Sequence, residues 1–190
     1  DKTANNLQIN FKKNLGKAEA IRSAVIQVYD KYDFEYIGYW DADCATPLSE
    51  IMNLRNEILN KKIILVFGSR IKTLGRIIKR KKIRHFLGRI IATVASIILK
   101  LEVYDTQCGA KLFDSKFIKK IFIKKFKTKW LFDIEIFFRT KHYYGDDIFL
   151  EFPLEKWTDI KGSKISLIDC IKILYNIIKI IIYYRLKNWI

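Results

Sequence analysis

The sequence is short of the features that mark disulfide-rich, zinc-binding or membrane-spanning proteins. Its 190 residues include three cysteines, none of them in a C-x-x-C pair. This odd number argues against a disulfide framework and a thiolate metal site, and it indicates a reducing, cytoplasmic compartment. No apolar run reaches the roughly 18 to 20 uncharged residues of a membrane span. Arg89 and Lys100 bound the run 90–99, and Lys179 interrupts the last one, so we expect no segment to cross a bilayer.

Acidic residues are also scarce relative to basic ones. The chain has 20 Asp and Glu against 36 Lys and Arg, a formal net charge of +16. A surface of this charge attracts anionic partners by long-range steering, and nucleic acid, acidic lipid and phosphorylated substrates all qualify. Hydrophobic residues make up 50% of the chain, enough at this length for one sizeable core. With no repeat, linker or low-complexity tract present, residues 1–190 are expected to form a single domain.

Apolar periodicity predicts an α/β fold. Strands are expected at 36–40 and 63–67, with a helix over 48–59 between them and a helix over 15–29, capped by Asn14, before them. Parallel strands joined by right-handed crossovers place their carboxyl ends at one edge of a sheet. Asp41 and Asp43, which follow the first strand, and Arg70, which follows the second, should therefore meet at that edge.

The rest of the chain contains further predicted elements of both kinds. A basic segment, 71–89, leads into a helix that ends near residue 101, and a polar stretch around a glycine then precedes a short apolar strand or turn over 110–113. A helix is expected over 130–138, a strand over 148–152 and a long helix over 167–186. The polar residues 157–164 before the last helix have the character of a loop that closes over a substrate.

Asp41 and Asp43 are the strongest candidates for a metal site. Residues two apart in an extended segment point the same way, so both carboxylates can face one divalent cation. Hard oxygen ligands suit Mg²⁺ or Mn²⁺, and such a metal can bridge a diphosphate. The same residues also fit a turn and a helix start, in which Asp43 or Thr46 caps a helix that begins at Pro47.

Three other features each allow two interpretations. The basic segment 71–89, which includes Arg84, is either a solvated helix face or a surface for lipid head groups or a pyrophosphate. Asp133 lies in an otherwise apolar helix, where an unpaired carboxylate is costly, and it is either a helix cap or a catalytic base. The last helix either packs on the sheet or lies in a membrane interface.

Six blocks of residues occur in order along the chain. They are residues 14–17 (Asn-Leu-Gly-Lys), 41–43 (Asp-Ala-Asp), 68–70 (Gly-Ser-Arg), 105–109 (Asp-Thr-Gln-Cys-Gly), 130–135, and Trp157 together with 162–164 (Gly-Ser-Lys). Together they resemble the family 2 glycosyltransferases of the GT-A fold, in particular the dolichyl-phosphate and polyprenyl-phosphate β-glucosyltransferases. The resemblance implies a Rossmann-like, mostly parallel sheet flanked by helices.

The same resemblance extends to the first residues of the chain. Residues 1–3 (Asp-Lys-Thr) look like the end of the family's Asp-Gly-Ser-x-Asp-x-Thr loop. This implies that the first strand and part of the nucleotide-binding half precede this sequence.

The resemblance also implies roles for particular residues. Asp41 and Asp43 would hold Mg²⁺ or Mn²⁺ and the sugar nucleotide, and Asp133, with Asp105 as the second candidate, would be the catalytic acid residue. The wider family carries Gln at the position of Ala45, so a water or the donor phosphates would complete the metal shell here. Further donor- and acceptor-binding residues are expected to be Lys17, Gly68, Ser69, Arg70, Arg84, Gln107, Gly109, Trp157, Ser163 and Lys164.

The activity implied by the resemblance is an inverting hexose transfer. The expected donor is a nucleotide-diphosphate sugar such as UDP-glucose, and the acceptor is a polyprenyl phosphate or a glycan, as in cell-envelope polysaccharide synthesis. A phosphate acceptor is already ionised near neutral pH, so positioning by Arg70 and Arg84 matters more than a strong base. The protein would then work peripherally, at the cytoplasmic face of the membrane.

Three alternatives remain at this point. The acceptor could be a polysaccharide hydroxyl, which needs an acid residue nearby to take its proton. A basic nucleic-acid-binding module would explain the charge, but Asp41, Asp43, Asp105 and Asp133 would repel a phosphate backbone, and no nucleic-acid-binding motif is present, so no nucleic-acid partner is expected. The third alternative is a membrane-surface scaffold that keeps the fold without turnover.

Overall fold

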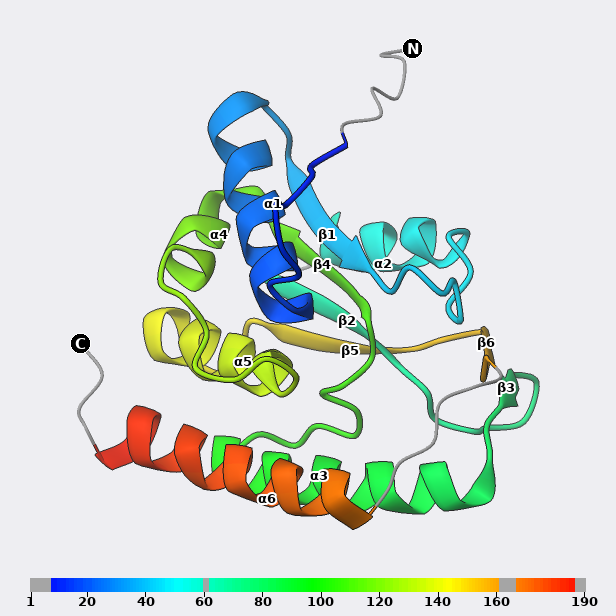
Figure 1. Cartoon of the computed structure of the whole chain (residues 1–190). Coiled ribbons are helices and arrows are strands. Elements are labelled where there is room, and N and C mark those ends of the chain that lie inside the picture. The colour runs from blue at the N-terminus through cyan, green and yellow to red at the C-terminus, as the bar shows by residue number, and fades with distance from the viewer. Residues whose placement is uncertain (1–7, 60–61, 161–166, 187–190) are drawn as a thin grey trace.

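A four-stranded sheet lies at the centre of the molecule, with helices packed around it (Figure 1). The computed structural model describes residues 8–59, 62–160 and 167–186, apart from the side chains of residues 82–84, 167–171 and 186. The central strands are β1 (Tyr36–Trp40), β2 (Leu65–Ser69), β4 (Ala110–Asp114) and β5 (Phe149–Pro153), and a separate pair is formed by β3 (Ile77–Lys79) and β6 (Lys156–Thr158). The helices are α1 (Lys17–Lys31), α2 (Glu50–Leu59), α3 (Lys82–Leu99), α4 (Ser115–Phe122), α5 (Phe132–Tyr144) and α6 (Leu167–Ile181), which continues as the π-helix η1 (Ile182–Leu186).

The central sheet is mixed, with the strand order β1-β4-β2-β5. β2 and β5 are parallel, whereas β4 is antiparallel to both of its neighbours. β1, β2 and β5 therefore run in one direction, as the β-α-β order predicts, and their carboxyl ends share one edge. The expectation of mostly parallel pairing is corrected by β4, which lies between β1 and β2 in the opposite direction. Apolar alternation is the same for either direction of a strand, so the sequence pattern does not reveal this insertion.

The two faces of the sheet pack against different elements. Directly paired residues point to the same face, and Phe67 belongs to such a row across all four strands. The row consists of Tyr39, Lys111, Phe67 and Glu151. This face packs on α1, α4 and α5, whereas the opposite face, which carries Val66, packs on α2 and the β3–β6 pair. A lysine and a glutamate thus occupy the same buried face as the main apolar core.

A buried ion pair fixes the segment that leads into α5. Glu135 accepts hydrogen bonds from the backbone N–H groups of Lys127 at 2.8 Å and Thr128 at 2.7 Å. Arg139, one turn later, donates to three backbone carbonyl groups within residues 121–125. The Tyr184 hydroxyl of η1 donates to Glu135 and accepts from Arg139. The first turn of α5, which carries Asp133, is therefore held in one position.

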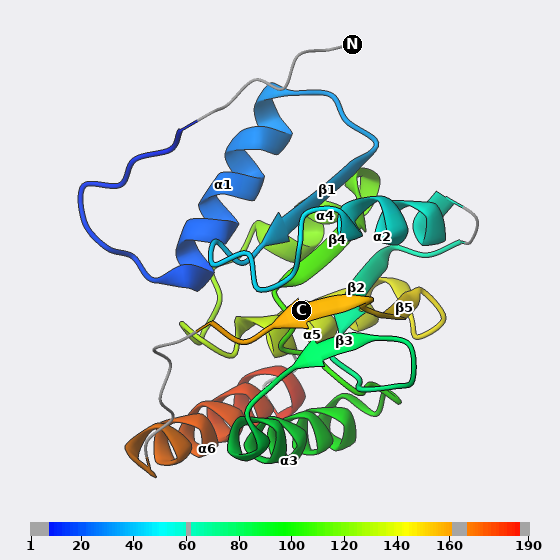
Figure 2. The ribbon, with the colours of Figure 1, turned by 90° about the vertical axis from the view of Figure 1, so that its right-hand side faces the viewer.

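The helices α3 and α6 lie side by side along one side of the molecule (Figures 1 and 2). A groove of about 310 Å³ runs between them and is lined by Leu87, Ile90, Ile91, Val94, Ile173, Leu174 and Ile177. Ile90 and Leu174 are 48% and 59% exposed, so this apolar face is partly open to solvent. Within the described ranges, no helix combines the length and apolar character that crossing a membrane requires.

The observed elements differ from the predicted ones mainly at their ends. α1 begins at Lys17, because Gly16 occupies the N-cap with φ +81° and Asn14, the predicted cap, accepts from the Gly16 N–H instead. β2 extends to Ser69, so Gly68 and Ser69 lie in the strand rather than after it. The sequence predicted a basic segment where β3 lies and a loop where most of β6 lies. Both strands were missed because their pairing joins distant parts of the chain.

Candidate functional site

Several predicted residues meet at the edge where β1 and β2 end and β4 begins. Asp41 directly follows β1, Arg70 directly follows β2, and Gly109 directly precedes β4. The backbone N–H of Asp41 donates to the carbonyl of Gly109 at 3.0 Å, which continues the β1–β4 pairing beyond the strands. The antiparallel β4 therefore places the loop 105–109 beside the acidic loop after β1.

The carboxylate of Asp41 is packed against Gly109. A Cβ at position 109 would lie 2.0 Å from both Cγ and Oδ2 of Asp41, so glycine leaves the room that this carboxylate occupies. Lys17 Nζ lies 2.5 Å from Asp41 Oδ1, and the side chains of the pair are 40% and 36% exposed. Ion pairs this exposed contribute little to stability. The Asp41 carboxylate thus packs against Gly109 and is accessible from solvent.

Asp43 lies two residues later in an exposed turn. Its Oδ1 accepts a hydrogen bond from the Ala45 N–H at 3.0 Å, and Cys44 between them has φ +53°. The turn interpretation of this segment is therefore confirmed, but the predicted helix start at Pro47 is wrong, because α2 begins at Glu50.

The donor set of Asp41 and Asp43 fits Mg²⁺ or Mn²⁺ in chemistry, since both carboxylates offer hard oxygen ligands. In the described part of the chain, no three His, Cys, Asp or Glu side chains are grouped closely enough to hold a metal by themselves. Further ligands would have to come from a substrate or from water.

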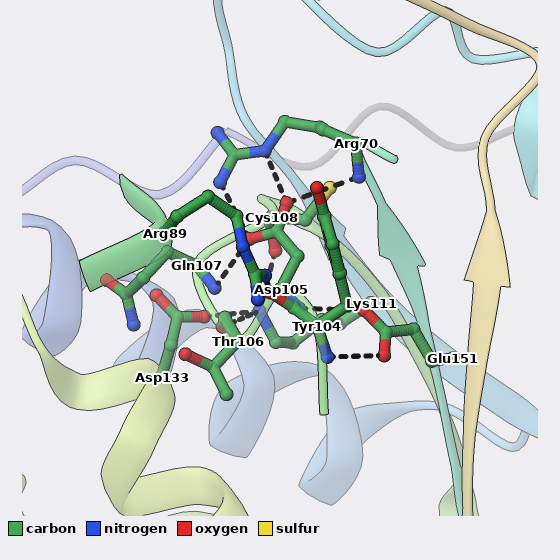
Figure 3. A network of polar contacts seen from close by, with 10 residues as sticks. All are labelled: Arg70, Arg89, Tyr104, Asp105, Thr106, Gln107, Cys108, Lys111, Asp133 and Glu151. Carbon is green, nitrogen blue, oxygen red and sulfur yellow. Dashed lines mark hydrogen bonds and ion pairs between the residues drawn. The ribbon is translucent and has the colours of Figure 1, made fainter. Parts of the chain in front are cut away.

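Asp105 and Arg70 form a buried bidentate ion pair (Figure 3). Arg70 Nε lies 2.6 Å from Asp105 Oδ2 and Nη2 lies 2.8 Å from Oδ1, and the backbone N–H groups of Arg70 and Gln107 also donate to this carboxylate. Burial acts to raise the pKa of Asp105, but the Arg70 guanidinium outweighs it and leaves the pKa below its usual value of 3.8. The guanidinium also lies 5.4 Å from the ring of Trp157, so its orientation is fixed from two sides.

The backbone around Asp105 is held by two further side chains. Glu151 of β5 accepts from the backbone N–H groups of Tyr104 and Asp105, both at 2.7 Å. Burial raises the pKa of Glu151, although these hydrogen bonds oppose the shift. Arg89 of α3 donates to the Tyr104 carbonyl and lies 3.7 Å from the centre of its ring. The loop is thereby tied to β5 and to α3.

Asp133 is buried beneath this loop and is paired (Figure 3). Its Oδ1 accepts from Lys111 Nζ at 2.6 Å and from the Tyr39 hydroxyl at 2.5 Å. Burial, with the Asp133 charge second, raises the pKa of Tyr39 well above its ordinary value, so this hydroxyl stays a donor. The helix-cap interpretation of Asp133 is wrong, because Leu131 is the N-cap of α5 and no side chain caps it.

A basic pocket of about 180 Å³ adjoins Arg70. It is lined by Arg70, Lys72, Ile78, Arg80 and His85. Burial, together with the charges of Arg80 and Arg89, lowers the pKa of His85. The pocket presents the cations Arg70, Lys72 and Arg80 from the ends of β2 and β3 and from the loop between these strands, with His85 at the start of α3 beside them, which suits a compact anion such as a phosphate.

The other predicted residues have varied surroundings. Gly68 packs against Leu154 and Cys108, and Ser69 is 1% exposed. The buried side-chain nitrogen of Gln107 has no hydrogen-bond partner within the described ranges. Cys108, which contacts Gly68, is fully buried, and this burial raises the pKa of its thiol to about 11 and keeps it protonated. Ser163, Lys164 and the side chain of Arg84 lie outside the described residues.

Three residues of the network were not predicted from the sequence: Lys111, Glu151 and Tyr39. Each lies on a strand and points to the buried face of the sheet. A signal was present for Lys111 and Glu151, because a charged residue within a short apolar strand needs a buried partner. The charged partner of Lys111, Asp133, is 22 residues away in the sequence, and Glu151 binds the Tyr104 backbone 47 residues away.

Comparison with known proteins gives a consistent set of relatives. No model of a protein family matches the chain. It is 30% identical over 199 residues to a dolichyl-phosphate beta-glucosyltransferase of Trichomonas vaginalis, in an alignment that covers 100% of this chain and 57% of that protein. It is 31% identical over 193 residues to the dolichyl-phosphate beta-glucosyltransferase of Saccharomyces cerevisiae, covering 94% of this chain and 55% of the yeast protein. The chain thus spans little more than half the length of these relatives.

A solved structure with a similar fold is glucosyl-3-phosphoglycerate synthase from Mycobacterium tuberculosis in complex with Mn²⁺ and UDP-glucose. The superposition has a TM-score of 0.64 and covers 90% of this chain and 55% of that protein, at 15% sequence identity. At this identity the similarity establishes the fold, which is the GT-A fold.

The Asp105–Arg70 pair should make stability depend on pH. We expect Asp105→Asn to lower the free energy of unfolding by about 3 kcal/mol at pH 7, because it leaves Arg70 buried without its anion. The folded-state pKa of Asp105 lies below its ordinary value of 3.8. The difference in free energy of unfolding between wild type and Asp105→Asn should therefore be constant above that pH and shrink as the pH falls below it. Urea denaturation between pH 3 and 7 measures this, with the exposed pair variant Asp146→Asn as control. A difference from wild type that does not change with pH would contradict the assignment.

Proposed function

The chain is a relative of the dolichyl-phosphate β-glucosyltransferases with the GT-A fold of family 2 glycosyltransferases, and we propose that it transfers glucose from UDP-glucose to a polyprenyl phosphate with inversion. The observation that carries this proposal is the meeting of Asp41, Gly109 and Arg70 at one edge of the sheet. The relatives are almost twice as long as this chain, so the activity is proposed for the full-length protein.

The acidic loop after β1 is proposed to bind the donor diphosphate. Asp41 and Asp43 would hold Mg²⁺ or Mn²⁺, which supplies charge neutralisation for the departing diphosphate. Gly109 leaves room for the Asp41 carboxylate, and the Gln107 amide nitrogen, buried and without a partner within the described ranges, can donate to a bound ligand. Lys17, at 2.5 Å from Asp41, is placed to contact diphosphate oxygens. Support for the donor comes from the related fold, which was solved with Mn²⁺ and UDP-glucose.

In the transfer proposed here, an acceptor oxygen forms a bond to the anomeric carbon of the sugar from the side opposite the diphosphate. The bond from that carbon to the diphosphate oxygen breaks, and its electron pair leaves with UDP. The task of the protein is to align the two oxygens and to stabilise the negative charge on the leaving group. Arg70, held by Asp105 and Trp157, is a fixed cation at the edge where both would bind.

The state of the buried acids favours a phosphate acceptor over a hydroxyl. Asp105 is bound by Arg70, and Asp133 is bound by Lys111 and Tyr39. The lowered pKa of Asp105 makes it a weak proton acceptor. Asp133 is buried and already accepts hydrogen bonds from Lys111 and Tyr39, so neither acid is well placed to deprotonate a hydroxyl. A phosphate needs no deprotonation, and the basic pocket beside Arg70 has the charge to hold one.

The face formed by α3 and α6 is proposed to rest on the cytoplasmic membrane surface, where a polyprenyl phosphate is found. Its exposed large apolar side chains include Phe86, Ile90, Ile97, Leu174, Tyr175, Ile178 and Ile182. Interfacial helices combine such a face with basic residues, and the start of α3 lines the basic pocket through His85. A lipid whose chain lies along this face could thus present its phosphate to the pocket.

The central test is product analysis. The full-length protein, incubated with Mn²⁺, a panel of nucleotide sugars and a short polyprenyl phosphate, should form a polyprenyl-phosphate hexose from UDP-glucose in preference to the other donors. Mass spectrometry identifies the product, and a glycan acceptor is tested in parallel. Transfer to the glycan hydroxyl with none to the phosphate would contradict the acceptor assignment, and absence of any transfer would support the scaffold alternative.

Gly109→Ala should abolish transfer without unfolding the protein. The added methyl group occupies the position of the Asp41 carboxylate and displaces it, and a misplacement of this kind is expected to lower kcat/KM roughly 100-fold. Asp43→Ala should have an effect of similar direction. Gly145→Ala is the matched control, because a Cβ there meets open space and its φ of +89° strains the backbone far from the site. Wild-type transfer by Gly109→Ala would count against the role of Asp41.

Ile90→Asp combined with Leu174→Asp should weaken membrane binding. Both residues line the apolar groove and are about half exposed, so the added charges face the proposed lipid rather than the core. Sedimentation with vesicles that contain anionic phospholipid measures the bound fraction. Met52→Asp on α2 is the control, since it adds the same charge at a 55% exposed apolar residue on the other side of the sheet. Equal binding of both variants would exclude the α3–α6 face as the contact surface.

A further inference from the structure

Lys111 is a fully buried lysine near the start of β4. Its exposed fraction is 0%, and it pairs in register with Tyr39 on one side and with Phe67 on the other. Burying an ammonium group is costly unless it is paired and hydrogen-bonded, and an apolar residue would fill this position more cheaply. A specific requirement for the charge is therefore expected at this position.

The ammonium group of Lys111 has three protons, and each has an acceptor. Nζ lies 2.6 Å from Asp133 Oδ1, 2.6 Å from the Cys108 carbonyl and 3.1 Å from the Thr106 carbonyl. With its donors used within the protein, Lys111 has none left for a substrate. Any effect on a reaction must pass through the groups that it holds.

These groups belong to two separate parts of the candidate site. The two carbonyls belong to the loop 105–109, which carries Asp105 and Gln107 and ends at Gly109, the residue against which Asp41 packs. Asp133 lies on α5, a helix that packs on this face of the sheet. The Lys111 ammonium is the point where this loop, α5 and the sheet are joined (Figure 3).

The described hydrogen bonds of Asp133 all fall on one oxygen. Both Lys111 and Tyr39 donate to Oδ1. This one-sided arrangement fixes the rotation of the carboxylate and therefore the direction of Oδ2.

From this geometry we propose that Lys111 is a positioning residue for sugar transfer, which, anchored by Asp133 of α5, holds the loop 105–109 in the arrangement that transfer requires. The inference rests on the proposed function. It predicts that loss of the ammonium lowers kcat/KM of the folded protein, because the loop that it holds carries Gln107 and ends at Gly109, against which Asp41 packs. A purely structural role would lower the folded fraction and leave the turnover of folded molecules unchanged.

The experiment compares Lys111→Met with Lys141→Met in the full-length protein. Lys141 also forms a lysine–aspartate ion pair, with Asp146 at 2.7 Å, but at the far end of α5 and on the surface. For each variant, thermal unfolding gives the folded fraction, steady-state kinetics with UDP-glucose and polyprenyl phosphate give kcat and KM, and mass spectrometry follows amide hydrogen exchange in residues 105–109.

For Lys111→Met we expect kcat/KM per folded molecule to fall roughly 100-fold, with kcat itself lowered. Amide exchange in residues 105–109 should rise at least about tenfold, because two of the loop's carbonyls lose their donor. Lys141→Met should match wild type in all three measurements. Unchanged exchange in the loop, or a kcat that falls only in proportion to the folded fraction, would overturn the inference.

A second variant covers the case in which Lys111→Met does not fold. Tyr39→Phe removes only the hydroxyl that donates to Asp133 and leaves the ring in the core. It should fold and lower kcat on the order of tenfold, the size typical for outer-shell groups, because it loosens the Asp133 carboxylate that anchors Lys111. Wild-type turnover by Tyr39→Phe would then overturn the inference. If wild type itself shows no transfer, the proposed function fails, and the exchange measurement alone decides the role of Lys111.

Discussion

A charge that is buried at the carboxyl edge of this sheet has to be paired, and the pairing determines where the loop 105–109 lies. Asp105 is paired with Arg70, Asp133 with Lys111, and the backbone N–H groups of residues 104 and 105 with Glu151. Each partner comes from a different strand or helix. The loop therefore has one position in which all of these groups are satisfied, and any shift would leave a buried charge without its counter-ion.

This constraint separates two kinds of groups at the site. The buried acids are engaged by cations and serve to hold the loop, whereas Asp41, Asp43 and the basic pocket beside Arg70 face solvent. The fixed groups supply geometry, and the accessible groups supply ligands and charge. Such a division suits a transfer between two phosphorylated substrates, because most of the chemical difficulty lies in aligning them and in stabilising the leaving group.

The site and the apolar face of α3 and α6 are connected through the start of α3. His85 of the first turns of α3 lines the basic pocket, Arg89 one turn later holds the Tyr104 backbone, and Ile90 already belongs to the apolar groove. One helix thus passes from the charged edge to the apolar face within two turns. For an acceptor with a phosphate head and an isoprenoid chain, this order of polar and apolar residues matches the order of the ligand itself.

How far the sequence predicts the site is best seen at Asp41 and Lys111. Asp41, Asp43 and Arg70 were placed at a common edge from strand endings alone, because the position of a residue after a strand is a local property and parallel strands end on the same side. The direction of β4 was not predicted, and with it the contact between Gly109 and Asp41 and the partners of Lys111. The contact of Gly109 with Asp41 and that of Lys111 with Asp133 join segments 22 or more residues apart, which no local periodicity encodes.

The sequence by itself thus determined the α/β class, the acidic pair and the excess of positive charge, since each follows from composition or from spacing along the chain. Only the tertiary structure decided which acids are accessible to solvent and which are buried and bound by cations. The physical reason is that an acid's role depends on whether a cation or a hydrogen-bond donor reaches it. At this site the groups that do so are Lys111 of β4, Arg70 directly after β2 and Tyr39 of β1. The insertion of one antiparallel strand brings them together.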